Sequence, residues 1–215
     1  VQGFTGIDFE EALEAMLKDA TVPPGGTEEQ EGRGGLTDYN RIGYVSQNFH
    51  RGGTRTVEYA YNDFNIATVA KGLGKLEIAS RYYDQANNWQ NLWRDISNNG
   101  STGFIMPRNA DGSWVDTINC DLNDAPRESI DYHPLARDWP RCVCWWCGFL
   151  YEASSWEYSL YVPHDVTSLV VKSGGTVAFR RRLDTLFDSD FYNVGNEPSF
   201  LSPTLYHWIG RPDLS

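Results

Sequence analysis

Two consecutive stretches of apolar residues at helical spacing most constrain what this chain can fold into. Residues 56–74, TVEYAYNDFNIATVAKGLG, carry apolar side chains every three or four positions, which predicts a helix that begins at Thr54 or Thr56 and ends at the two glycines. A second stripe follows almost at once and predicts another helix, with its apolar face made of Leu76, Ala79, Tyr83, Ala86 and Trp93.

Helical signals recur along the rest of the chain. Asp8 and Glu11 form the pattern of a capping box, and the apolar residues that follow predict a first helix up to Ala20. Further helices are predicted at 154–161, 165–172 and 176–187, and after Pro198. We expect a long loop over 27–47 and an extended excursion with a turn over 103–118, whereas 119–148 gives no clean signal. Consecutive antiparallel helix pairs with functional loops at one end suit a mainly α chain that forms part of an α/α toroid.

Charge and apolar run lengths exclude two classes of partner. The net charge is −11, and the one basic run, Arg180 to Arg182, is expected to be a solvated helix face, so we predict no nucleic-acid partner. No apolar run reaches the roughly 20 residues that span a bilayer, so we predict no membrane partner. The first residues, VQGFTGIDFEE, carry no signal-peptide pattern, whereas Asn99-Gly100-Ser101 is an acceptor triplet for N-glycosylation.

The cysteines leave two alternatives open. The cluster CVCWWC holds Cys142, Cys144 and Cys147, and its spacing is not a usual one for four zinc ligands. In a secreted protein, a disulfide from Cys120 into the cluster is favoured over zinc, and the pairing stays open.

Acidic and amide side chains stand beside aromatic rings in many places. Examples are Glu58-Tyr59, Trp156-Glu157 and the stretch YEASSWEYSLYVPHD at 151–165, in a chain that is 14% aromatic. Sugars offer apolar C–H faces to aromatic rings and hydroxyl groups to carboxylates and amides, and glycosidic cleavage needs carboxyl groups. The alternative is that each acid is a solvated residue at the end of a core helix. The pattern therefore indicates a helical protein and favours carbohydrate chemistry without deciding it.

Several motifs resemble glycoside hydrolase family 92, which consists of calcium-dependent exo-acting α-mannosidases. They are YEASSWEYSLYVPHDV, FRRRLDTLF and GNEPSFLSPTLYHWIGRP, preceded in the family's order by TRTVEYAYNDFNIATVAKGLGK, NNWQNLW and GFIMPRNADGSW. The resemblance runs from about Gly6 to Ser215 and is weakest over 119–148. The variants SSWEYS and PSFLSP resemble the fungal branch, since other members tend to have Gln at the position of Glu157.

The resemblance implies roles for individual residues. Glu152 matches the general acid, whose pKa must be raised so that it can protonate the departing oxygen. Asn196 and Glu197 match ligands of a Ca²⁺ ion that orients the sugar's 2- and 3-hydroxyl groups. Residues expected to hold the terminal mannose are Trp156, Glu157, His164, Asp165 and Asp63, and Asp165 is also expected to cap the next helix.

The resemblance also implies parts that these 215 residues do not contain. The family has an N-terminal β-sandwich domain, and its general base is expected in an acidic Gly-Asp-Glu-Asp stretch that does not occur here. We therefore expect 1–215 to be a partial catalytic toroid domain, with 119–148 as an uncertain insert, that is inactive when isolated. The expected reaction is calcium-assisted, inverting hydrolysis of terminal α-mannosidic linkages, most simply α-1,2, in mannose-rich glycans by a secreted enzyme.

Three alternatives remain at this point. The chain could be a non-catalytic sugar-binding or pseudoenzyme fragment. It could belong to another α/α-toroid glycosidase or lyase, in which Glu157 or Asp165 acts as the base. It could also be a purely structural helical protein. Linkage preference and oligomeric state are not readable from the sequence.

Overall fold

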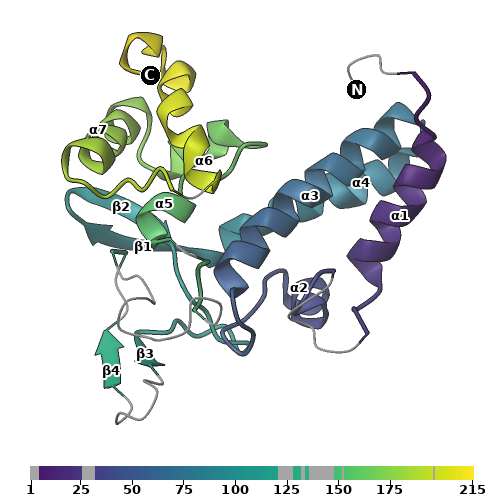
Figure 1. Ribbon diagram of the computed structural model, residues 1–215, viewed down its shortest axis with the longest axis horizontal. Helices are drawn as coiled ribbons and strands as arrows, with labels where there is room; N and C mark the ends of the chain where they lie inside the picture. Colours follow the sequence, from purple (N-terminus) through teal and green to yellow (C-terminus); the bar gives the residue numbers. More distant parts are fainter. Residues whose placement is uncertain are drawn as a thin grey trace.

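The computed structural model describes residues 5–25, 32–120, 128–131, 134–135, 148–151, 153–195 and 197–215. The prediction of a mainly helical chain is confirmed. In Figure 1, α1, α3 and α4 run together at one end of the molecule, and α5, α6 and α7 gather beside the β1–β2 hairpin at the other. The described residues form two sheets of two strands each and no β-sandwich.

The N-terminal helices α1 (Phe9–Thr21), α3 (Gly52–Gly72) and α4 (Leu76–Gln85) form one packed group. Asp8 caps α1 as predicted, because its Oδ1 accepts hydrogen bonds from the backbone N–H groups of Glu10 and Glu11. The helices share one apolar cluster, built from Leu13, Ala20, Ile66, Ala67, Ala70, Ala79 and Tyr82. The small alanines let the helix backbones approach closely.

The prediction of a continuous loop over 27–47 is wrong in its second half, where α2 (Leu36–Ile42) forms. Gly35 and Gly43 flank this helix with φ of 70° and 78°, backbone angles that glycine adopts without strain. Leu36 and Tyr39 are buried in a cluster with Val45 and Tyr59. Contact with α3 therefore stabilises a helix that the polar, glycine-rich sequence does not predict.

The helix predicted to reach Trp93 ends at Gln85 instead. A short 3₁₀ helix, η1 (Asn88–Leu92), follows, and β1 (Trp93–Asn98) then pairs antiparallel with β2 (Ser101–Ile105). The turn at Asn99 and Gly100 has φ of 45° and 77°, as tight hairpins require. Trp93, expected on the helical stripe, contacts Trp89 edge to face across this junction.

The predicted excursion after β2 is confirmed. Arg108 and Trp114 form an isolated bridge around a turn at Asp111-Gly112. β3 (Thr117–Cys120) pairs with β4 (Glu128–Asp131) at the edge of the 119–148 region. Most of that region lies outside the described residues, as do Cys142, Cys144, Cys147 and the side chain of Cys120.

The C-terminal part contains α5 (Ser155–Tyr158), α6 (Val166–Lys172), α7 (Thr176–Asp188), η2 (Glu197–Ile209) and η3 (Pro212–Leu214). The predicted helix at 154–161 is thus a single turn, and the segment after Pro198 is 3₁₀ rather than α. These elements pack on the hairpin around the main core, whose largest members include Trp89, Trp156, Phe104, Phe149 and Phe179.

Arg182 corrects the expectation that the run Arg180 to Arg182 is a solvated face. Its side chain is 1% exposed, and its Nη1 donates a 2.7 Å hydrogen bond to the carbonyl oxygen of Gly103. The guanidinium lies 4.3 Å from the ring centroid of Phe104 and also faces the ring of Trp156. Burial lowers the pKa of Arg182 to about 9. The arginine therefore joins α7 to β2 from inside the core.

Candidate active site

The first turn of α3 holds the segment that precedes Glu152. The N–H of Arg51 donates to the carbonyl oxygen of Gly148 at 2.7 Å, and the N–H of Gly53 donates to that of Phe149 at 3.0 Å. The N–H of Tyr151 donates to Oγ1 of Thr54 at 2.8 Å. A Cβ atom on Gly53 would lie 2.4 Å from the ring of Phe149, so only glycine allows this approach. These contacts fix the chain up to Tyr151.

A cavity of about 470 Å³ opens beside this anchored segment. Its lining residues are Glu58, Tyr151, Tyr158, Tyr161, Glu197, Phe200 and Leu201. The fold thereby brings two predicted functional segments to one place, because Tyr151 directly precedes the expected acid and Glu197 is an expected calcium ligand. Glu152 itself and Asn196 lie outside the described residues.

Glu157 connects the segment that follows Glu152 with the loop that carries Glu197. Its carboxylate is 3% exposed. Oε2 accepts hydrogen bonds from the N–H and the hydroxyl of Ser154, at 2.9 and 3.0 Å. Oε1 accepts hydrogen bonds from the N–H of Asn193 at 3.1 Å and the hydroxyl of Ser199 at 3.4 Å. One buried carboxylate therefore joins the turn after Glu152 to the loop that carries Glu197.

Trp156 lies in the main core rather than on the cavity wall. Its side chain is 0% exposed and contacts the rings of Phe104 and Phe191. Its Nε1 donates a 2.9 Å hydrogen bond to Oδ1 of Asn98 at the end of β1. Direct contact between Trp156 and a sugar stays a prediction that would require the core to open.

His164 and Asp165 follow α5 at the start of α6. The predicted cap is confirmed, because Oδ1 of Asp165 accepts a 3.2 Å hydrogen bond from the N–H of Ser168. Nε2 of His164 lies 2.8 Å from the carbonyl oxygen of Ala86, and its ring stacks on Tyr61 of α3. Burial lowers the pKa of His164, although the Ala86 carbonyl and Asp165 act in the opposite direction. His164 therefore joins α6 to α3 and α4.

Asp63 is 0% exposed and forms a buried ion pair. Its Oδ1 accepts a 2.7 Å hydrogen bond from Nη1 of Arg33, and its Oδ2 accepts a 2.8 Å bond from the hydroxyl of Tyr39. Both oxygens are thus engaged within the protein, which favours a structural use of this carboxylate. The expected contact of Asp63 with mannose stays a prediction.

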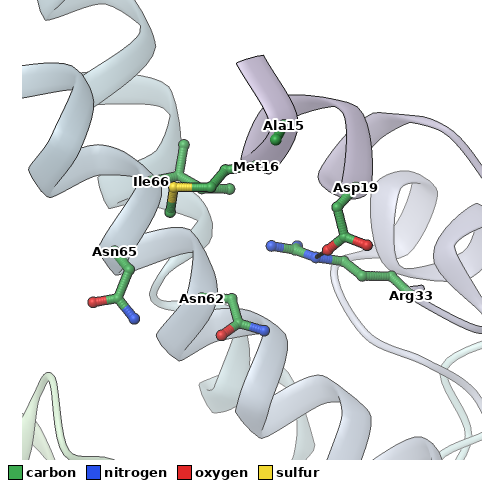
Figure 2. A pocket seen from close by; sticks show the side chains of 7 residues that line it. All are labelled: Ala15, Met16, Asp19, Arg33, Asn62, Asn65 and Ile66. Carbon is green, nitrogen blue, oxygen red and sulfur yellow. Dashed lines mark hydrogen bonds and ion pairs between the residues drawn. The ribbon is translucent and has the colours of Figure 1, made fainter. Parts of the chain in front are cut away.

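Arg33 extends from this ion pair into a second cavity of about 410 Å³ between α1 and α3 (Figure 2). Figure 2 shows Arg33 and Asp19 pointing toward one another, and their Nε and Oδ2 atoms are 3.3 Å apart. The remaining lining residues are Ala15, Met16, Asn62, Asn65 and Ile66. This cavity holds none of the predicted site residues.

Glu58 is the cavity residue whose role the sequence did not indicate. It lies one turn after Thr54 on α3 and is half-buried. Burial raises the pKa of its carboxyl group. Burial also raises the pKa of Tyr161, and the negative charge of Glu58 adds to that increase. The only signal in the sequence was the pair Glu58-Tyr59, one of many acids beside rings.

The fit of a calcium ion can be judged from the part of the chain that the structure describes. Glu197 offers a carboxylate at the cavity, the type of oxygen donor that Ca²⁺ prefers. Within the described ranges, no group of three or more His, Cys, Asp or Glu side chains could hold a metal ion. The same residues contain no helix that is long and apolar enough to cross a membrane.

Comparison with known proteins identifies the family. The model of the glycosyl hydrolase family 92 catalytic domain matches residues 1–215. The chain belongs to glycosyl hydrolase family 92. A family 92 inverting mannosidase from Bacteroides thetaiotaomicron has a similar structure, with a TM-score of 0.78 and 28% identity over 98% of this chain and 28% of that one. This similarity agrees with the predicted α/α-toroid class.

Two further relatives support the same assignment. A family 92 α-mannosidase from the same bacterium, solved in complex with mannoimidazole, has a TM-score of 0.74 and 28% identity over 97% of this chain and 26% of its own. An "uncharacterized secreted glycosidase" of the fungus Arthroderma benhamiae is 38% identical over 97% of this chain and 27% of its own length. The chain thus spans about a quarter of the length of these relatives.

Proposed function

We propose that this chain is part of an exo-α-mannosidase that hydrolyses terminal α-mannosidic linkages in mannose-rich glycans. The observation that carries the proposal is the aromatic cavity that Tyr151 and Glu197 line together. Membership of family 92 supports the reaction class, and the two Bacteroides relatives are described as mannosidases. Rings for the apolar sugar face and carboxylates for its hydroxyl groups suit such a substrate.

In the proposal, Glu152 protonates the departing glycosidic oxygen as the general acid. Asn196 and Glu197 contribute oxygen ligands to a Ca²⁺ ion, which supplies positive charge where the sugar hydroxyl groups bind. Trp156, Glu157 and Asp63 are buried, so we propose that they hold the sugar indirectly, through the segments that they fix in place. His164 and Asp165 are half-buried, and we propose that they contact the terminal mannose directly.

The finer features also belong to the proposal. They are α-1,2 preference, inversion, secretion, and the place of 1–215 within one larger catalytic domain. Inversion is supported by the relative described as an inverting mannosidase, and secretion by the fungal relative described as secreted. We propose that the isolated 215 residues do not turn over substrate, because the implied general base has no counterpart among them.

The test uses the complete gene product and α-1,2-linked mannobiose, with released mannose as the readout. We expect turnover that is lost in a calcium chelator and restored by added Ca²⁺. Glu152→Gln should lower kcat about a hundredfold or more, because general acid catalysis contributes 10²- to 10⁴-fold. An aryl mannoside with a good leaving group should suffer much less from this change, since it needs little protonation.

The matched control is Glu77→Gln, which changes an exposed glutamate on α4 and should leave kcat unaltered. Wild-type turnover by Glu152→Gln would refute the acid role. Absence of any α-mannoside turnover, with calcium-dependent mannose binding retained, would replace the proposal by a binding protein.

A further inference from the structure

The position of Glu58 follows from how α3 is anchored. Thr54 and Glu58 are four residues apart on one helix, so their side chains share a face. Thr54 accepts the hydrogen bond from the N–H of Tyr151, which places Glu58 one turn further along the wall next to the segment of the expected acid. Glu58 and Glu197 then line the same cavity from different elements, α3 and η2.

The surroundings of the Glu58 carboxyl group are unusual for a structural carboxylate. Among the described residues, no side chain or backbone group donates a hydrogen bond to it, and loss of hydration alone raises its pKa. Four of the six other residues that line the cavity carry rings, namely Tyr151, Tyr158, Tyr161 and Phe200, and the other two are Glu197 and Leu201. Burying a carboxyl group against rings without a partner costs free energy.

Two other buried acids show what a structural role looks like in this fold. Asp63 accepts hydrogen bonds on both oxygens, from Arg33 and Tyr39. Glu157 accepts four hydrogen bonds from three residues. Glu58 has no such set, although it is half-buried. A partly desolvated carboxyl group that faces a cavity without a protein partner is typical of ligand-binding sites.

We propose that Glu58 is a sugar-contacting residue, whose carboxyl group forms hydrogen bonds with a hydroxyl group of the glycoside bound in the 470 Å³ cavity. The inference rests on the proposed function and deepens it. The rings of the cavity cover the apolar face of the sugar, and Glu58 accepts a hydrogen bond from a sugar hydroxyl group on the side of the cavity that α3 forms. Neither the family motifs nor the expected calcium site assigns a role to this residue.

The first test compares Glu58→Gln and Glu58→Ala in the complete gene product. Loss of a hydrogen bond between a sugar hydroxyl group and the charged carboxylate should weaken substrate binding. Glu58→Ala should therefore lower kcat/KM about ten- to a hundredfold, mostly through a higher KM. Glu58→Gln keeps the size and one acceptor oxygen and should lose less. The control Glu77→Gln should keep the wild-type kcat/KM. The melting temperature of Glu58→Gln should not fall, because no protein hydrogen bond is lost.

The second test separates contact with the sugar from an indirect effect. Mannosides that lack one hydroxyl group each are assayed with wild type and with Glu58→Ala. If Glu58 binds one hydroxyl group, the penalty of the Ala variant should disappear for the substrate that lacks that group and persist for the others. An equal penalty for every deoxy substrate would overturn the inference, as would an unchanged KM in both Glu58 variants.

The two proposals can fail separately. A protein that hydrolyses no α-mannoside refutes the proposed function. A protein that hydrolyses α-mannosides with wild-type kinetics in both Glu58 variants refutes only the inference about Glu58.

Discussion

Replacement of Glu157 should release the loop that carries Glu197 while leaving the rest of the fold in place. The two oxygens of this carboxylate serve different segments, because Oε2 binds Ser154 and Oε1 binds Asn193 and Ser199. Glu157→Ala removes both attachments. Glu157→Gln has only one acceptor oxygen, so it can accept a hydrogen bond from the N–H of Ser154 or from that of Asn193, but not from both. The two variants therefore predict different local effects.

The size of the effect follows from the backbone donors. The N–H groups of Ser154 and Asn193 each lose an acceptor in Glu157→Ala, and an unsatisfied N–H costs about 1–3 kcal/mol when it is not hydrated. Taking about 2 kcal/mol for Asn193, the opening of the 193–199 loop becomes roughly 30-fold more populated. If Glu197 binds Ca²⁺ as proposed, loss of this supporting contact should also weaken calcium affinity about 10- to 100-fold.

Amide hydrogen exchange measured by mass spectrometry checks this reasoning. Glu157→Ala should accelerate exchange at both Ser154 and Asn193, and Glu157→Gln at only one of them, whereas peptides from α3 should exchange at the wild-type rate. Glu77→Ala, on the exposed face of α4, is the matched control and should change neither site. If exchange at Asn193 in Glu157→Ala stays within about threefold of wild type, the reasoning is refuted, because the hydrogen bond to Glu157 would then not limit the opening of this loop.

Two further predictions follow from the described residues. Burial lowers the pKa of His164 below its ordinary 6.5, so the protein should lose stability as the pH falls below 6.5 and through the pKa of His164 in the folded state. His164→Gln should therefore lose less melting temperature than wild type between pH 7.5 and 5. Equal losses in the two proteins would contradict the prediction. Asn99 is exposed at the tip of the β1–β2 turn, so protein secreted from fungal cells should lose mass on treatment with an N-glycan-releasing enzyme. Asn99→Gln should show no such shift, and an unglycosylated wild-type protein would refute this assignment.

Helices with a local start or stop signal could be predicted from the sequence. Asp8 and Asp165 cap α1 and α6 as expected, and α3 ends at Gly72, where the first of its two terminal glycines stands. Such signals act through the residue's own backbone neighbourhood and need no tertiary partner. The prediction of a helix through Trp93 was wrong because apolar spacing alone takes no account of the turn at Asn99-Gly100. This turn pairs β1, which begins at Trp93, with β2 in a hairpin.

The candidate site was predictable only in part, for the same reason. Glu197, predicted as a calcium ligand, lines the cavity beside Tyr151, and its role as a ligand stays a prediction. Glu58 was missed because its orientation depends on the docking of Tyr151 onto Thr54, which no local pattern encodes. Arg182 was misread because a basic run usually faces water, whereas here the rings of β2 and α5 surround one of its three members.

Acidic residues beside aromatic rings are common in this sequence, and in the structure they differ in whether protein groups donate hydrogen bonds to their carboxylates. The buried carboxylate of Asp63 meets a guanidinium and a hydroxyl group, and that of Glu157 meets two backbone N–H groups, so their desolvation is offset within the protein. Glu58 is half-buried beside rings and has no described donor, so a bound ligand can supply the hydrogen bond that offsets its partial desolvation. A carboxyl group of the first kind should cost stability when it is neutralised, and one of the second kind should cost substrate affinity instead. Parallel measurements of melting temperature and KM on Asp63→Asn and Glu58→Gln would therefore distinguish the two uses of an acid within a single helix, α3.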